Sequence, residues 1–171
     1  MKRWLWIRRL IAWDHRVSQR WQEGAKGHLH AAAILGAHLG DGWLWIGFLA
    51  LLLLIGSAEH RALAWRWAAA MALAGGITTS LKFVWRRQRP RQRSGFYSQT
   101  YDKHSFPSGH ATRMGTVAVF LPALFPQWGW IVWPLIAWVG WSRVALGVHY
   151  LLDVVTGFVL GAIIAFVLAV V

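Results

Sequence analysis

Residues 128–171 read WGWIVWPLIAWVGWSRVALGVHYLLDVVTGFVLGAIIAFVLAVV, two apolar stretches separated by a short polar one. The apolar parts, 128–141 and 150–171, approach the length of about 20 residues that spans the hydrocarbon core of a bilayer. Three more apolar stretches precede them, over 43–57, 62–84 and 111–125. This pattern predicts an all-α fold, a polytopic membrane bundle with five to six transmembrane helices.

The composition agrees with a membrane environment. Hydrophobic residues make up 57% of the chain, Trp alone contributes 14 residues, and the mean hydropathy is +0.40. A soluble helical bundle with an oversized core is the alternative, but it would leave few helix faces polar. Trp43, Trp85 and Trp128 lie at the ends of apolar stretches, where interfacial aromatic residues gather. The length predicts a single domain, 1–171.

The first residues, 1–26, are amphipathic. Aromatic and aliphatic side chains recur there at helical spacing, at Trp6, Leu10, Trp13, Val17 and Trp21. Basic residues lie mostly on the other side, at Lys2, Arg9, Arg16 and Arg20. This arrangement is typical of a helix in the interface plane that rests on anionic headgroups. A short, tilted crossing that completes the bundle is the alternative.

Glycines mark two places where helices are predicted to bend or meet. Residues 29–39 form a short apolar stretch that Gly40-Asp41-Gly42 interrupts, which indicates a re-entrant or interfacial piece. Gly157 and Gly161 form a small-xxx-small pair, which favours close helix packing over a dimer contact. The oligomeric state stays open.

The chain is strongly basic, with a formal net charge of +12. Five arginines lie in the connection 86–106, at Arg86, Arg87, Arg89, Arg91 and Arg93. In a soluble protein such a patch would suggest a nucleic-acid partner. Because membrane stretches flank it, anionic lipid headgroups are the predicted counterpart, and no nucleic acid is expected. An ordinary solvated loop would have the same composition.

Three polar clusters separate the apolar stretches. They are Lys82 with Arg89-Pro90, then Pro107-Ser108-Gly109-His110, then Ser142-Arg143 with His149 and Asp153. Antiparallel threading of the helices, with a turn at Pro126-Gln127, brings all three clusters to one face of the bilayer. Ionisable residues in membrane segments are costly and are functional candidates by default. We therefore expect one polar site at this face.

Each cluster has a use in binding a phosphate. Ser108, Gly109 and His110 begin a predicted helix, where unpaired backbone N–H groups and the helix dipole favour an anion. Lys82, Arg89 and Arg143 can donate charge-assisted hydrogen bonds to phosphate oxygens. Taken singly, the Pro-Ser-Gly turn could be an ordinary helix cap, and each cation could contact headgroups instead.

The two histidines of these clusters suggest a nucleophile and an acid. His149 and Asp153 are four residues apart, so on a helix they share a face. The carboxylate could hold one ring nitrogen and make the other more nucleophilic, although a structural His–Asp pair has the same spacing. His110 lies on a separate turn and could protonate a leaving oxygen.

The three clusters together resemble the signature of the type 2 phosphatidic acid phosphatase superfamily. Lys82 is followed after six residues by Arg89-Pro90, and Arg143 after five residues by His149 and after three more by Asp153. All three parts match in order and without a substitution. The resemblance covers residues 61–171 well and the first 60 residues only loosely.

The resemblance implies a helical membrane bundle, usually of six helices, that removes phosphate from a lipid phosphate or diphosphate without a metal or cofactor. His149 would form a phosphohistidine, oriented by Asp153, and His110 would protonate the leaving group and later activate water. Lys82, Arg89, Ser108, Gly109 and Arg143 would hold the phosphate oxygens. No metal site is expected, and the chain has no Cys to supply a thiolate.

The sequence leaves the substrate and the reaction partner open. Phosphatidic acid, phosphatidylglycerophosphate, undecaprenyl diphosphate and lipid A all present a phosphate at headgroup level. A lipid phosphotransferase would use the same intermediate, and a binding or transport protein would use the same pocket. The predicted location is a bacterial inner membrane. By resemblance the site faces the periplasm or the outer surface, whereas the arginines of 86–106 would place it in the cytoplasm by the positive-inside rule.

Overall fold

The fold is all-helical, as predicted. A computed structural model of the chain describes residues 4–91 and 103–170. The elements are α1 (Leu5–Gly24), α2 (His28–Leu39), α3 (Gly42–Ile55), α4 (Ala58–Trp85), α5 (Gly109–Leu124), the 3₁₀ helix η2 (Pro126–Ile131), α6 (Val132–Ala145) and α7 (Leu151–Val170). No strand occurs in these two ranges. Arg93 and the rest of 92–102 lie outside the described residues.

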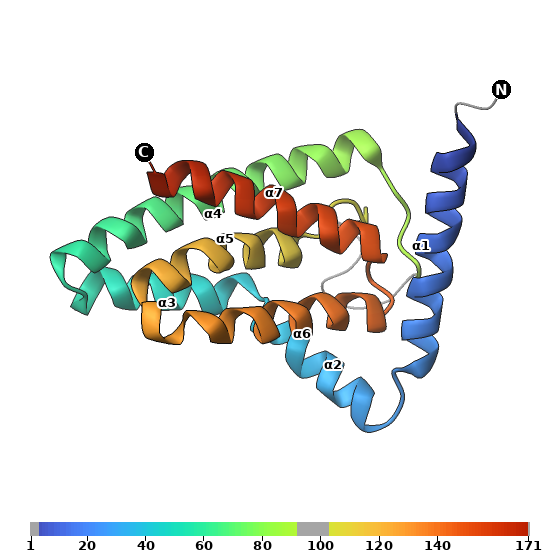
Figure 1. The fold of residues 1–171 in the computed structure, drawn as a ribbon, viewed down its shortest axis with the longest axis horizontal. Coiled ribbons are helices and arrows are strands. Elements are labelled where there is room, and N and C mark those ends of the chain that lie inside the picture. The colour runs from blue at the N-terminus through green and yellow to red at the C-terminus, as the bar shows by residue number, and fades with distance from the viewer. Residues whose placement is uncertain (1–3, 92–102, 171) are drawn as a thin grey trace.

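Helices α3 to α7 run side by side along the long axis, and α1 lies across one end of them (Figure 1). Helix α5 packs against α4, α6 and α7, so it forms the centre of the bundle. The C-terminal ends of α4 and α6 and the N-terminal ends of α5 and α7 all lie at the end that α1 covers (Figure 1). Antiparallel threading therefore brings the predicted clusters to one end of the molecule.

Two helices in the described residues, α4 and α7, are long and apolar enough to cross a membrane. The pair α2 and α3, bent by 43°, could form a third crossing. Helices α5 and α6 have 16 and 14 residues, fewer than the about 20 that span a full hydrocarbon core. By length and composition the described residues therefore hold two membrane-crossing helices, or up to three, and α5 and α6 run beside them in the same bundle (Figure 1).

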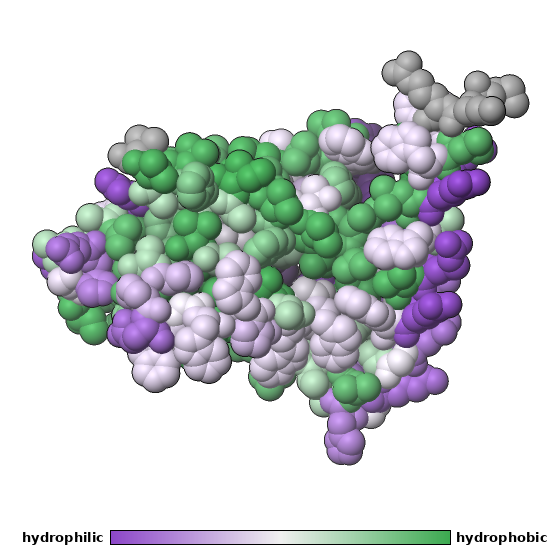
Figure 2. Space-filling view, viewed as in Figure 1, coloured by the Kyte–Doolittle hydropathy of each residue, from purple (hydrophilic) through white to green (hydrophobic). Residues whose placement is uncertain are grey.

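Apolar side chains cover the long side of the bundle, while hydrophilic residues line α1 at one end and gather at the other end (Figure 2). This distribution suits a bundle whose long axis crosses the bilayer. Helix α1 turns Trp6, Leu10 and Trp13 outward, and all three are exposed. An interfacial helix with exposed apolar residues is what the pattern of 1–26 predicts.

Helices α5 and α7 cross at very close range because glycines face the opposite backbone. A side chain at Gly161 would collide with the backbone of Thr112, and one at Gly115 with that of Phe158. Gly157 lies in the same way against Ser108. The small-xxx-small pair thus packs inside the chain, as predicted.

Buried hydrogen bonds join α4 to α5 below the polar end. The indole of Trp67 donates to Thr116 at 3.0 Å, and Thr78 donates to Thr112 at 3.1 Å. Thr112 in turn donates to the carbonyl of Ser108 at 2.9 Å. Because buried polar groups are costly unless paired, these bonds favour one register between the two helices.

Candidate active site

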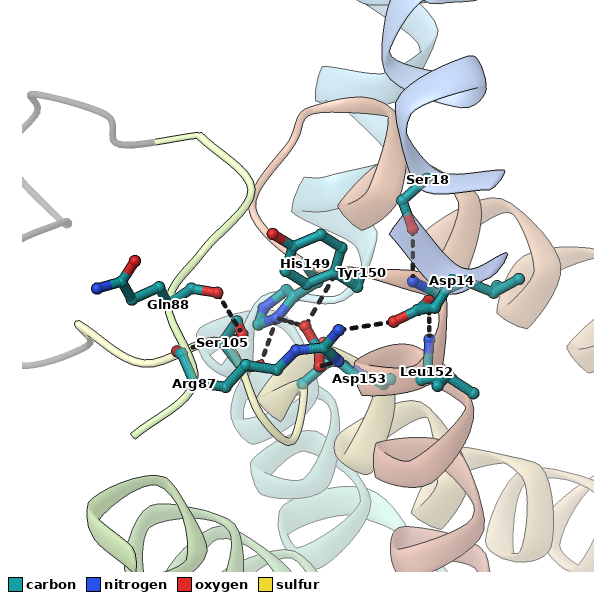
Figure 3. A network of polar contacts seen from close by, with 12 residues as sticks. Asp14, Ser18, Arg87, Gln88, Ser105, His149, Tyr150, Leu152 and Asp153 are labelled. Atoms are coloured by element: carbon teal, nitrogen blue, oxygen red, sulfur yellow. Dashed lines mark hydrogen bonds and ion pairs between the residues drawn. The ribbon is translucent and has the colours of Figure 1, made fainter. Parts of the chain in front are cut away.

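His149 is buried in the short connection between α6 and α7. Its Nδ1 donates a hydrogen bond to the carbonyl oxygen of Ser105 at 2.7 Å (Figure 3). A carbonyl can only accept, so this bond places the proton on Nδ1 and leaves a lone pair on Nε2. Ser105 is held in turn, because its own N–H donates to the carbonyl of Arg87 at 2.8 Å.

Burial lowers the pKa of His149 to about 4. The carboxylate of Asp153 opposes this shift, and the positive charges of Arg143 and Arg89 add to it. The ring is therefore neutral at pH 7, the form that a nucleophile requires. The same charges show that Arg89 and Arg143 lie close to His149, as the three-cluster pattern predicts.

Asp153 lies in the first turn of α7, and its carboxylate is bonded to the turn that carries His149. One carboxylate oxygen accepts from the backbone N–H of Tyr150 at 2.8 Å, and the other accepts from Arg87 at 2.6 Å. The distance from Asp153 to Nδ1 of His149 is 3.8 Å. The predicted His–Asp pair is present, but the short hydrogen bond to the ring comes from Ser105.

The second cluster begins α5 as predicted. Ser108 is the N-cap residue, and its hydroxyl accepts from the N–H of Ala111 at 3.4 Å. The N–H of Ser108 donates to the carbonyl of Asp153 at 3.0 Å, which ties the start of α5 to α7. Gly109 faces open space, since a side chain there would meet only Thr78. A ligand could approach the backbone at this glycine.

His110, the next residue, interacts electrostatically with both His149 and Arg143. Its Nε2 lies 2.9 Å from a carboxylate oxygen of Asp41. Asp41 also contacts Nδ1 of His38 at 2.9 Å and accepts from the indole of Trp43 at 3.3 Å. The sequence predicts only a helix break at Gly40-Asp41-Gly42 and misses this partner, because only the fold brings the break between α2 and α3 to His110 at the start of α5.

Lys82 lies on the wall of a cavity of about 310 Å³ between α4 and α5. Gly109, Thr112 and Arg113 line the side formed by α5, and Met71 and Phe83 contribute apolar surface from α4. A cation and a free helix start thus meet apolar surface in one cavity. This combination suits a ligand with a phosphate and a hydrocarbon part.

Two further charged residues were not predicted as site residues. Arg87, expected to contact headgroups, bonds to Asp153 at 2.6 Å and to Asp14 of α1 at 2.7 Å. Asp14 is fully buried. A signal for it exists in the sequence, since Asp14, Ser18 and Gln22 recur every four residues and form a polar stripe on an otherwise amphipathic helix.

Comparison with known proteins adds sequence and structural relatives. The family model described as the PAP2 superfamily matches residues 63–171. An undecaprenyl-diphosphatase of Sulfolobus acidocaldarius is 32% identical over 145 residues, which cover 81% of this chain and 68% of that protein. A lipid A 4'-phosphatase of Porphyromonas gingivalis is 33% identical over 70 residues, which cover 40% and 30%.

Two solved structures share the fold. The crystal structure of Aquifex aeolicus LpxE has a TM-score of 0.77 at 22% identity and covers 91% of this chain and 94% of its own. A PAP2 type phosphatidylglycerolphosphate phosphatase from Bacillus subtilis has a TM-score of 0.71 at 22% identity, with coverage of 94% and 84%. The family match includes all eight predicted site residues, whereas Asp14 and Asp41 lie outside it.

Proposed function

The chain belongs to the PAP2 superfamily, and from this membership we propose that it is a membrane phosphatase that hydrolyses a lipid phosphate or diphosphate through a phosphohistidine. The observation that carries this proposal is the state of His149. The ring is buried and neutral, its Nδ1 proton is bound by Ser105, and its Nε2 has a free lone pair. Arg89 and Arg143 beside it supply positive charge for a phosphate.

In the first step, Nε2 of His149 attacks phosphorus and a P–N bond forms while the bond from phosphorus to the leaving oxygen breaks. His110, which takes up a proton when the anionic phosphate lies beside its ring, gives that proton to the oxygen. Since Nε2 of His110 faces Asp41 at 2.9 Å, the proton leaves from Nδ1. Lys82, Arg89 and Arg143 stabilise the charge that spreads over the phosphoryl oxygens, together with the N–H groups at the start of α5.

In the second step, water attacks phosphorus and the P–N bond breaks. His110, now neutral, accepts the proton of the water, so the ring that acted as acid acts as base. Inorganic phosphate leaves, and His149 returns to its neutral form. None of these steps needs a metal ion, because the cations and the helix start supply the electrostatic stabilisation.

The substrate is proposed at the level of class, a phosphate or diphosphate on a lipid. The relatives are named for different lipids, undecaprenyl diphosphate in one case and lipid A in another. The cavity beside Lys82 combines polar and apolar lining residues, which suits the region where a headgroup meets its tail. We further propose a bacterial inner membrane as the location, with the site at the periplasmic side.

The test is phosphate release by the purified protein in detergent micelles. Phosphatidic acid, phosphatidylglycerophosphate, undecaprenyl diphosphate and lipid A are offered separately, each with EDTA and with or without an acceptor lipid. We expect release from at least one lipid in the presence of EDTA and without an acceptor. Release that requires the acceptor would instead identify a phosphotransferase.

The test variant is His149→Ala. Its matched control is His28→Ala, because His28 is an exposed histidine at the start of α2. Loss of the nucleophile should lower the rate on the order of a thousandfold or more and abolish the phosphoprotein seen after rapid alkaline quench. His28→Ala should keep both. Robust turnover by folded His149→Ala would refute the proposed role.

A further inference from the structure

Helix α1 buries a polar stripe rather than an apolar one. Asp14 and Ser18 are fully buried, and Gln22 is 7% exposed. On the other side of the helix, Trp6 and Trp13 are exposed. Burial of polar side chains is unfavourable unless they find partners, so the contacts of this stripe indicate what α1 does.

The stripe supplies hydrogen-bond acceptors to the start of α7. The N–H of Leu152 donates to Asp14 at 2.9 Å, and the N–H of Leu151 donates to Ser18 at 3.0 Å. The first N–H groups of a helix have no partner within that helix. Helix α1 therefore caps α7 from a distant part of the chain, two residues after His149.

Asp14 also holds a charge that reaches the site. Its second carboxylate oxygen lies 2.7 Å from one end of the Arg87 guanidinium, and Asp153 lies 2.6 Å from the other end (Figure 3). The guanidinium lies 4.2 Å from the centre of the Tyr150 ring. The ring of His15 in α1 stacks on the same tyrosine, with 4.4 Å between the ring centres. Arg87 is thus clamped between two carboxylates and an aromatic ring.

Arg87 in turn holds His149 by two routes. Its side chain binds Asp153, which accepts from the N–H of Tyr150 at 2.8 Å and so fixes the turn that follows His149. Its backbone carbonyl accepts from the N–H of Ser105 at 2.8 Å, and the carbonyl of Ser105 accepts from Nδ1 of His149 at 2.7 Å. A displacement of Arg87 would move both supports of the imidazole.

We propose that Asp14 is a positioning residue of the active site, acting through Arg87 on Asp153 and His149. The inference rests on the proposed function, because it assigns Asp14 a role in the attack by His149. Asp14 lies outside residues 63–171 that match the family model. Through Asp14 the amphipathic helix then positions the reacting groups as well as contacting the membrane.

The variant Asp14→Asn tests this role. Its amide oxygen can still accept from the N–H of Leu152, but the negative charge that faces Arg87 is lost. We expect kcat to fall on the order of 10- to 100-fold, as for a misplaced reacting group, with KM little changed. The rate of phosphoenzyme formation should fall by the same factor. Glu23→Gln is the matched control, since Glu23 is an exposed acid on the same helix, and it should leave kcat unchanged.

A double-mutant cycle separates positioning from a general structural effect. Arg87→Lys keeps the positive charge but lacks the fork that binds two carboxylates. If Asp14 acts through Arg87, Asp14→Asn should lower kcat much less in the Arg87→Lys background than in the wild type. Fully additive losses would overturn the proposed route.

The outcomes distinguish this inference from the proposed function. A wild-type protein that releases no phosphate from any lipid defeats the function. A wild-type protein that is active, with Asp14→Asn folded and equal to it in kcat, defeats the inference alone. If thermal unfolding shows that Asp14→Asn is not folded, Asp14→Glu is the decisive variant, because it keeps the negative charge and shifts it by one methylene. A lower kcat at unchanged KM supports the inference, and an unchanged kcat overturns it.

Discussion

The imidazole of His149 illustrates how burial acts on a single residue. The Ser105 carbonyl at 2.7 Å and the loss of solvent determine which ring nitrogen can attack in the proposed mechanism and that the ring is neutral. The neighbouring arginines add to the effect, since they disfavour a second positive charge. A nucleophile that is neutral before substrate binds is ready for attack without first losing a proton.

This shift predicts how stability depends on pH. The unfolded ring takes up a proton near pH 6.5, whereas the folded ring does so near pH 4. Between these values the unfolded state binds more protons, so the free energy of unfolding falls as the pH falls, by at most about 1.4 kcal/mol per pH unit. Thermal unfolding in detergent from pH 7.5 to 4.5 should show a shallower loss for His149→Gln than for the wild type. Parallel curves would contradict the shift.

At the scale of elements, the break between α2 and α3 has a clear use. The bend of 43° lies at Gly40-Asp41-Gly42, and it brings Asp41 to His110 at 2.9 Å. Glycine is needed at position 40, because a side chain there would meet Val139 and the His110 ring. The break therefore supports the ring to which we assign proton transfer.

We expect Asp41→Asn to lower kcat on the order of 10- to 100-fold, because an amide holds the His110 ring less firmly than a carboxylate does. His38→Ala is the matched control. It removes another partner of Asp41, but one that is exposed, so its kcat should stay within about twofold of the wild type. Steady-state phosphate release measures both, and equal rates for Asp41→Asn and the wild type would argue against this role.

The crossing of α5 and α7 is a second element whose geometry the site needs. Gly161→Ala places a methyl group against the backbone of Thr112, so the helices must separate. We expect a loss of about 1–3 kcal/mol in stability, seen as a lower Tm. Gly47→Ala is the control, because a side chain there meets nothing within 4 Å, and it should keep or raise Tm. A Gly161→Ala protein as stable as the wild type would show that the crossing can adjust.

For the whole molecule, the proposed orientation is open to a labelling experiment. The chain has no Cys, so a single introduced thiol is unique. Lys103→Cys marks the end with the site and Glu59→Cys the first turn of α4 at the opposite end of the bundle (Figure 1), and both positions are exposed. With the site at the periplasmic side, a membrane-impermeant maleimide should label Lys103→Cys in spheroplasts and Glu59→Cys only after lysis. The reverse pattern would place the site in the cytoplasm, as the loop arginines predict.

The helical membrane fold, the family and the three polar clusters could all be predicted from the sequence. Apolar length predicts helices in a bilayer, and antiparallel helices return their ends to the same side, so Lys82, His110 and His149 are expected at one end of the bundle without knowledge of any contact. Composition also separated α1 from the bundle, although it indicated only a membrane role.

The groups that hold the two histidines are known only from the folded structure. Ser105 lies 44 residues from His149, Asp41 lies 69 from His110, and Asp14 lies 73 from Arg87. Helical periodicity tells which residues of one helix share a face, but it contains no information on which face of another helix lies opposite. Which faces lie opposite depends on the glycines and buried polar groups that let α5 and α7 approach. It also depends on how α1 packs across the end of the bundle.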